Sequence, residues 1–267
     1  MPEGHVIEAQ ARALTKLFRN TAVTVDSPQG RFDAGSVNGR RCIAATAFGK
    51  HLFLCFDNDR VIHIHLGLYG KWAIATGSVP DVRGAIRLRL RNDRGYAELR
   101  GPSTCEVVNL EQMRKLIEGS GVDPLRKHAD PTPAWTFVSN SRSSIGALLM
   151  RQDVFAGVGN IYRAEVLFRA GISPFRPGRE ISQAEFDTIW RDLVALMAYG
   201  VKHGRIDTVR PEHEPETMGR EPRQDRHGGE VYVYRRAGLH CYVCDSIVRQ
   251  QDVQGRKLYW CELCQPS

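Results

Sequence analysis

Met1-Pro2-Glu3-Gly4 opens the chain and leads into a predicted helix over residues 3–18, where apolar side chains recur at helical spacing. Proline at position 2 is small enough for the initiator methionine to be removed, which leaves Pro2 as a free secondary amine. An α-amino group has a pKa of about 7.7–8.0 against about 10.4 for lysine, so roughly a quarter of such termini are neutral at pH 7.5. The neutral amine is a nucleophile, and Glu3 beside it can shuttle protons. Most Met-Pro starts carry no chemistry, so this motif becomes specific only through what lies downstream.

Downstream of the helix, residues 22–108 consist of short, alternating, β-branched runs separated by turn residues. The expected strands cover residues 41–47, 50–56, 60–66, 71–76, 84–91, 95–99 and 104–108. Several short strands at close spacing predict a β-sandwich or a barrel.

Beyond the strands, the sequence changes to helical periodicity. Helices are predicted over residues 110–119, 144–152, 160–170 and 182–199, and the proline-containing segment 123–133 is expected to hold a domain boundary. Residues 203–230 are polar and have no hydrophobic period, so they are predicted to be a mobile surface loop. The chain is therefore expected to be a multidomain α+β protein, with an N-terminal β-sandwich domain over 1–125, a helical domain over 126–230 and a cysteine module over 231–267.

Composition narrows the choice of partner and compartment. The 267 residues carry a net charge of +7 and a pI near 9.2, which favours a polyanionic partner, although many soluble proteins are mildly basic for no specific reason. The chain has neither an apolar run of membrane-spanning length nor a secretory signal. Cys42, Cys55 and Cys105 are isolated cysteines in apolar contexts, as expected in a reducing compartment. We expect a cytoplasmic, nucleoid-associated monomer with no membrane contact.

Four further cysteines form two pairs near the C-terminus. Cys241-Tyr-Val-Cys244 and Cys261-Glu-Leu-Cys264 are separated by sixteen residues, a spacing that matches a tetrahedral Cys₄ zinc site. Two disulfides are the alternative, but nothing indicates export. We predict one structural Zn²⁺, because four thiolates leave no open position for water.

Two other stretches suggest contacts with phosphate. A hairpin is predicted over 247–253 and 257–260, and Arg256 near its turn is either a phosphate ligand or a solvated surface arginine. Ala156-Gly157-Val158-Gly159-Asn160 precedes a helix that Asn160 is suited to cap. The amides of such a turn either bind an anion or only cap the helix.

Together these motifs resemble the formamidopyrimidine-DNA glycosylase/endonuclease VIII family of base-excision repair enzymes, and the resemblance spans nearly the whole chain. The matching stretches are Pro2-Glu3-Gly4, Phe48-Gly49-Lys50, His65-Leu66-Gly67-Leu68-Tyr69-Gly70, Gly157-Val158-Gly159-Asn160-Ile161-Tyr162 and the cysteine module. The resemblance implies an N-terminal β-sandwich domain, a domain with a helix–two-turns–helix motif and a C-terminal zinc-finger hairpin. The implied partner is damaged DNA, whether duplex, bubble or single-stranded.

The resemblance also assigns roles to single residues. Pro2 would be the Schiff-base nucleophile and Glu3 the acid/base of a bifunctional glycosylase and AP lyase that completes β- and δ-elimination. The phosphates around the damaged nucleotide would be held by Lys50, which belongs to the catalytic group, and by His65, Asn160 and Arg256. Without the family, Lys50 reads as a lysine after a turn and His65 as a satisfied strand histidine. Leu68 and Tyr69 would fill the gap left by a flipped nucleotide, and ordinary packing at a strand end is the alternative.

Two stretches distinguish branches of the family. The branch specific for 8-oxoguanine carries an Arg-Arg-Phe-Gly wedge where this chain has Glu98-Leu99-Arg100-Gly101-Pro102. The Leu68-Tyr69 pair resembles endonuclease VIII instead, and this resemblance implies oxidised pyrimidines as substrates. The chain as a whole most resembles the second endonuclease VIII group of actinobacteria.

This chain departs from the family pattern at three positions. Gly67 replaces the glutamine of some members, and His5 and Val6 replace the more usual residues after the glycine, so a supporting carboxylate is expected to come from Glu8 or Glu165 or to be missing.

Other functions remain open from the sequence. The main alternative is a non-enzymatic or catalytically weak zinc-containing protein that recognises abasic or single-stranded DNA. A purine-directed glycosylase and a zinc-stabilised RNA-binding protein are two others, and the last gives Pro2-Glu3 no role.

Overall fold

The computed structural model describes residues 2–225 and 228–266, so Met1 of the opening motif lies outside the described residues. The chain divides into two compact units, Met1–Gly119 and Ser120–Ser267, each with its own hydrophobic core. This division lies a few residues before the boundary predicted between 125 and 126. The cysteine module belongs to the second unit, and a separate domain over 231–267 stays a prediction.

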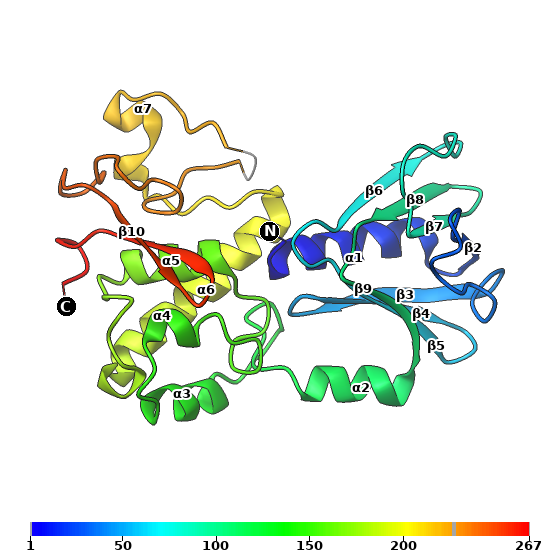
Figure 1. The fold of residues 1–267 in the computed structure, drawn as a ribbon, viewed down its shortest axis with the longest axis horizontal. Helices are drawn as coiled ribbons and strands as arrows, with labels where there is room; N and C mark the ends of the chain where they lie inside the picture. The colour runs from blue at the N-terminus through cyan, green and yellow to red at the C-terminus, as the bar shows by residue number, and fades with distance from the viewer. Residues whose placement is uncertain (1, 226–227, 267) are drawn as a thin grey trace. The chain divides into compact units, whose positions relative to one another are not determined.

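The first unit is a sandwich of two antiparallel sheets with one helix inside it and one outside (Figure 1). One sheet has the strand order β1-β3-β4-β5-β9 and the other the order β2-β7-β8-β6. The elements are α1 (Gly4–Phe18), β1 (Thr21–Ala22), β2 (Thr24–Asp26), β3 (Arg41–Phe48), β4 (His51–Phe56), β5 (Arg60–His65), β6 (Lys71–Thr76), β7 (Leu88–Arg91), β8 (Gly95–Arg100), β9 (Thr104–Asn109) and α2 (Leu110–Glu118). The predicted sandwich is confirmed. The predicted strand 84–91 is shorter and covers Leu88–Arg91, and β1 and β2 are not among the predicted strands.

Helix α1 packs its apolar face into the core of this unit and leaves Arg12, Ala13 and Lys16 on its other face exposed. Its apolar stripe, which includes Ile7, Leu14 and Phe18, is buried together with the inner faces of both sheets. The outer face of the five-stranded sheet is covered by α2, whose apolar side chains pack against Phe53 and Val61. Strands β4 and β5 are therefore buried on both faces, which explains their nearly continuous apolar sequence.

The second unit is mostly helical and ends in a β-hairpin (Figure 1). Its elements are α3 (Thr132–Ser139), α4 (Ile145–Leu148), α5 (Asn160–Arg169), η1 (Gly178–Glu180), α6 (Gln183–His203), η2 (Pro211–His213), α7 (Pro215–Met218), β10 (Arg249–Val253) and β11 (Arg256–Trp260). Helix α5 is buried on all sides at the centre of the core, and α6 begins with a capping box formed by Ser182 and Glu185. No helix in the described ranges is long and apolar enough to cross a membrane.

The structure differs from the sequence-based expectation in the segment 203–230. This stretch was predicted to be a surface loop without structure, but it contains η2 and α7, and Ile206 and Thr208 are buried in the core. The burial of a few apolar and hydroxyl side chains holds this segment against the core. They are too few to change its polar average composition, which is why the sequence did not predict an ordered segment. Helix α3 also lies partly in the predicted linker, where Pro133 occupies the first turn and is compatible with a helix start.

Candidate active site and DNA-binding residues

The start of α1 holds the two candidate catalytic residues. Pro2 is half-buried, and Glu3 is the N-cap residue of α1 with a side chain that is 1% exposed. The backbone carbonyl of Glu3 accepts a hydrogen bond from the amide of Val6 at 2.9 Å, which fixes the first turn. The candidate nucleophile Pro2 is thus attached, without an intervening flexible segment, to a helix that packs against the core.

Helix α1 runs antiparallel to β3, and hydrogen bonds set the register between them. The Oγ1 of Thr15 donates to the carbonyl of Ala45 at 2.8 Å and accepts from its amide at 2.9 Å. Just after the helix, the amide of Asn20 donates to the carbonyl of Cys42 at 2.7 Å. Residues nearer the N-terminus of α1 therefore lie beside residues nearer the C-terminal end of β3.

This register places the start of α1 level with the β3–β4 turn. From Thr15 back to Gly4 the helix covers about 16 Å at about 1.5 Å per residue. From Ala45 forward to Lys50 the strand covers about 16 Å at about 3.3 Å per residue. The candidate phosphate ligand Lys50 and the candidate nucleophile therefore lie at the same end of the sandwich.

Lys50 lies in a two-residue turn that closes the β3–β4 hairpin, whose last pair is Phe48 and His51. Gly49 has a φ of 56°, as a type II′ turn requires at its first central position. The next hairpin brings His65 to the same end, because His65 pairs with His51 across β4 and β5. The structure thus brings Lys50 and His65 together with the start of α1.

Immediately after His65, a tight turn exposes two large apolar side chains. The amide of Gly70 donates to the carbonyl of Leu66 at 2.9 Å and closes the turn. Leu68 is 50% exposed and Tyr69 is 83% exposed, whereas Leu66 is buried. Exposing both side chains forgoes the free energy of burying them, which makes the two residues candidates for contact with a partner.

The histidine residues beside this turn form a connected group on the outer face of the five-stranded sheet. The Nδ1 atom of His51 lies 2.9 Å from Nε2 of His63, and Nδ1 of His63 lies 3.0 Å from a carboxylate oxygen of Glu106. Burial, together with His63 and His65, lowers the pKa of His51 to about 4. Burial, Lys50 and His63 lower the pKa of His65 below its ordinary value. Sequence reasoning noticed only His65, although the alternation of His63 and His65 along one strand could have revealed the group.

In the second unit, Asn160 is bonded to the hairpin that carries Arg256. Its Nδ2 donates to the carbonyl of Lys257 at 2.9 Å, and its side-chain oxygen accepts from the guanidinium of Arg163. The expectation that Asn160 caps α5 is wrong: Gly159 is the N-cap residue, and Asn160 is the first residue of the helix. Its side chain is used to position the hairpin, and buried Arg163, which sequence reasoning missed, supports it.

Arg256 is the first residue of β11, directly after a turn made by Gln254 and Gly255. Both turn residues have a positive φ, 50° and 71°, as in a type I′ turn. The structure therefore places Arg256 at the tip of the hairpin and next to the residue that Asn160 holds.

The four C-terminal cysteines converge. Their sulfur atoms all lie within 4.8 Å of one another, with Cys241 3.8 Å from Cys264 and Cys244 3.4 Å from Cys261. Four thiolates around a tetrahedral Zn²⁺ at about 2.3 Å would lie about 3.8 Å apart. The donor set and its spacing fit a tetrahedral metal ion.

The two carboxylates considered as a substitute lie in different surroundings. Glu165 is fully buried and accepts hydrogen bonds from three successive amides, those of Tyr232, Val233 and Tyr234, at 2.7–2.9 Å, and from Thr208 Oγ1 at 2.6 Å. Glu8 forms an ion pair with Arg12 one turn further along α1. Glu165 is therefore a structural residue, and it ties α5 to the chain that leads into the cysteine module.

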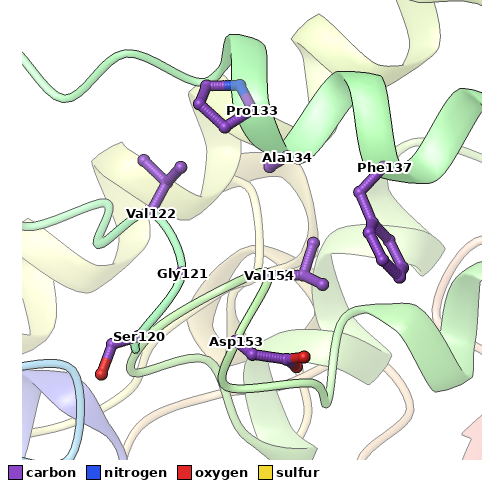
Figure 2. Close-up of a pocket in the computed structure, with 8 residues that line it drawn as sticks. All are labelled: Ser120, Gly121, Val122, Pro133, Ala134, Phe137, Asp153 and Val154. Carbon is purple, nitrogen blue, oxygen red and sulfur yellow. The ribbon is translucent and has the colours of Figure 1, made fainter. Parts of the chain in front are cut away.

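A pocket in the second unit contains none of the predicted site residues. It has a volume of about 290 Å³ and lies between α3, the segment 120–122 and residues 153–154 (Figure 2). Its lining is Ser120, Gly121, Val122, Pro133, Ala134, Phe137, Asp153 and Val154. The only ionisable side chain in this lining, Asp153, is paired with Arg151, so the pocket offers no catalytic group.

Comparisons with known protein families match both units. Residues 1–105 match the formamidopyrimidine-DNA glycosylase N-terminal domain, and residues 120–210 match the formamidopyrimidine-DNA glycosylase H2TH domain. The chain is similar to Endonuclease 8 1 of Mycobacterium tuberculosis, with 45% identity over 99% of this chain and all of that protein. It is also similar to Endonuclease 8 of Escherichia coli K12, with 25% identity over 99% of this chain and all of that protein.

A solved structure has the same fold. A complex of Lactococcus lactis Fpg with DNA containing an abasic site matches 99% of this chain and all of that one, with a TM-score of 0.81 and 21% identity. At this identity, the likeness shows the arrangement of the backbone and leaves the chemistry to the residues.

Proposed function

Because the chain belongs to the formamidopyrimidine-DNA glycosylase/endonuclease VIII family, we propose that the imino nitrogen of Pro2 is the nucleophile with which it excises damaged bases from DNA. The chain is a DNA glycosylase and AP lyase of base-excision repair. The observation that carries the assignment is the position of Pro2: it directly precedes a buried helix whose start is level with Lys50 and near His65.

In the proposed reaction, the Pro2 nitrogen attacks C1′ of the damaged nucleotide and the bond from C1′ to the base breaks. The electron pair of that bond leaves with the base, which takes up the proton that the attacking nitrogen loses. The lone pair of the nitrogen then breaks the bond from C1′ to O4′, O4′ takes a proton from the carboxyl group of Glu3, and the ring-opened sugar is held as an iminium ion. The iminium makes the C2′ proton acidic, so removing it expels the 3′ phosphate by β-elimination. A second elimination expels the 5′ phosphate, and hydrolysis of the imine frees Pro2.

Two features of α1 support these roles. The N-terminus of a helix carries a partial positive charge, which disfavours a cation and so favours the neutral, nucleophilic form of an amine placed there. Glu3 directly follows Pro2 in the sequence and is buried, so its carboxyl group is available to exchange protons with a reacting centre at the Pro2 nitrogen.

The remaining predicted residues would hold DNA. Lys50, His65 and Arg256 supply donors to phosphate, and Asn160 positions the hairpin that carries Arg256. Leu68 and Tyr69 are exposed at a turn, where they can enter the gap that a flipped nucleotide leaves in a duplex.

We propose oxidised pyrimidines as the substrate class. The turn that follows β8 has no wedge of its own: Gly101 has a φ of 60°, and a β-carbon at this position would lie 3.5 Å from the carbonyl oxygen of Tyr69. Within residues 66–70 and 98–103, the large apolar side chains that are exposed are Leu68 and Tyr69, as in the endonuclease VIII branch. An incision assay that compares thymine glycol with 8-oxoguanine in the same duplex tests this assignment, and faster incision at 8-oxoguanine contradicts it.

We propose that the metal held by the four cysteines is one structural Zn²⁺. Cys241, Cys244, Cys261 and Cys264 together complete its coordination, so it takes no part in the reaction. When bound, it supplies rigidity to the turns at both ends of the hairpin that bears Arg256.

Borohydride trapping on DNA containing an abasic site tests the central proposal. Protein that starts at Pro2 should form a reduced covalent adduct, and protein that retains a residue before Pro2 should not. Glu3→Gln should bind the same DNA while base excision falls by a factor of about 100 or more, the scale of a lost general acid. If mature protein gives no adduct, or if Glu3→Gln turns over normally, the proposal is wrong.

A further inference from the structure

The ring of His65 takes part in hydrogen bonds that define where its proton lies. The backbone amide of Gly67 donates to Nδ1 of His65 at 3.2 Å. The Oγ of Ser103 lies 2.9 Å from the same nitrogen and 3.0 Å from the carbonyl of His65. The amide of Ser103 also donates to that carbonyl, at 3.0 Å, so the serine is fixed beside the ring.

The two neighbours of Nδ1 constrain the tautomer differently. A serine hydroxyl can rotate and serve as donor or acceptor, but a backbone amide can only donate. With Nδ1 as the acceptor of the Gly67 amide, the one hydroxyl proton of Ser103 turns from the carbonyl of His65 to Nδ1, and that carbonyl keeps the Ser103 amide as its donor. In the neutral ring the proton is then on Nε2. A proton on Nδ1 would point at the hydrogen of the Gly67 amide.

The charged and titratable groups around His65 favour the neutral ring. Lys50 in the β3–β4 turn, His51 on β4 and His63 on β5 are its neighbours, and none of them carries negative charge. Glu106 on β9 is the cross-strand partner of His63, and its carboxylate is hydrogen-bonded to His63. Burial, Lys50 and His63 all lower the pKa of His65, which agrees with the neutral form.

The same contacts connect the histidine to the exposed turn. Gly67 is the first residue of the turn that carries Leu68 and Tyr69, and its φ is 65°. A β-carbon at position 67 would lie 2.9 Å from Cβ of Ser103. The glutamine of other family members therefore cannot be accommodated here without a shift, and the turn lies tightly between His65 and Ser103.

We propose that Ser103 and the Gly67 amide are positioning groups that hold His65 as the neutral tautomer with its proton on Nε2. His65 then meets a phosphate as a neutral donor, while its other nitrogen holds the Leu68–Tyr69 turn. The inference rests on the proposed function only in taking that phosphate to be part of DNA.

Nuclear magnetic resonance of the full-length protein labelled with ¹⁵N-histidine tests the tautomer without DNA. Long-range proton–nitrogen correlation at pH 7.5 should show the Nε2–H pattern for the signal that disappears in His65→Gln. An Nδ1–H pattern, or a doubly protonated ring, overturns the inference.

Ser103→Ala tests the positioning role, with Ser78→Ala as a control that makes the same change at an exposed position away from His65. Ser103 is exposed, so its loss should leave the unit folded. We expect Ser103→Ala to raise the pH at which His65 titrates and to slow excision from duplex DNA about fivefold, the scale of one lost hydrogen bond. Ser78→Ala should change neither. An unchanged His65 titration in Ser103→Ala overturns the role of Ser103.

Borohydride trapping by the wild-type protein separates this inference from the proposed function. Protein that traps abasic DNA but carries the Nδ1–H tautomer refutes the inference alone. Protein that shows the Nε2–H tautomer and fails to trap refutes the proposed function and leaves the tautomer assignment intact.

Discussion

Glu165 illustrates how one side chain can determine the path of a distant segment. Its two oxygens accept four hydrogen bonds, three of them from consecutive amides of residues 232–234, in a place that water does not reach. Those amides would otherwise be buried without partners, at a cost of about 1–3 kcal/mol for each group. The carboxylate thus allows the chain before the cysteine module to cross the core without regular secondary structure.

Glu165→Gln should therefore destabilise the second unit. One carboxylate oxygen becomes an amide group that donates, and it would face the amide of Tyr232, which also donates. We expect a loss of about 2–4 kcal/mol in the free energy of unfolding, measured by urea denaturation. Glu216→Gln, at an exposed position of α7, is the matched control, and equal stability of the two variants contradicts the assignment.

At the scale of elements, the face shared by β4, β5 and β9 makes the first unit sensitive to acid. Burial and two neighbouring histidines hold the pKa of His51 at about 4 in the folded chain, against 6.5 for a free histidine. As the pH falls through 6.5, His51 becomes protonated in the unfolded chain but stays neutral in the folded chain. Stability is therefore complete above pH 6.5 and decreases as the pH falls from 6.5 towards 4.

His51→Gln should reduce this dependence, because glutamine can hydrogen-bond to His63 but does not titrate. We expect the wild type to lose about 2 kcal/mol more than the variant between pH 7 and 4.5, after allowing for the partial exposure of the ring. Urea unfolding of both proteins at the two pH values measures the difference, and other acid-sensitive groups cancel in it. Parallel pH profiles would show that His51 is not the cause.

Across the second unit, the cysteine module and the segment 203–225 are joined by an aromatic contact. Tyr242, between two of the cysteines, lies under the guanidinium of Arg236 at 3.4 Å and under that of Arg220 at 3.9 Å. Arg220 also pairs with Glu230 at 2.7 Å. Cation–π contacts of this kind contribute about 0.5–2 kcal/mol each.

Loss of the metal should therefore loosen more than the hairpin. Cys264→Ser should release Zn²⁺, unfold the cysteine module and raise hydrogen exchange in residues 206–225 by about tenfold. Tyr242→Leu should raise exchange in the same segment while it retains the metal. If exchange in that segment stays unchanged in both proteins, the two regions are independent.

The sequence predicts those parts of the molecule that depend on patterns among neighbouring residues. The sandwich, α5, α6 and the cysteine cluster follow from periodicity and spacing, which neighbouring residues carry. The buried anchors Arg163, Glu165 and Thr208 were missed or left undecided, because their partners lie elsewhere in the chain and no local pattern marks them. Asn160 was misjudged for the same reason: its side chain prefers a carbonyl 97 positions away to the nearby helix end.

The absence of any spacer between Pro2 and α1 has a practical consequence. Any peptide fused ahead of Pro2 turns the secondary amine into an amide, which has no nucleophilic lone pair, yet the helix behind it can still fold. Such a fusion protein is expected to be an inert decoy that occupies lesions and blocks their repair. An affinity tag at this end would therefore make an active enzyme look like a mere binder.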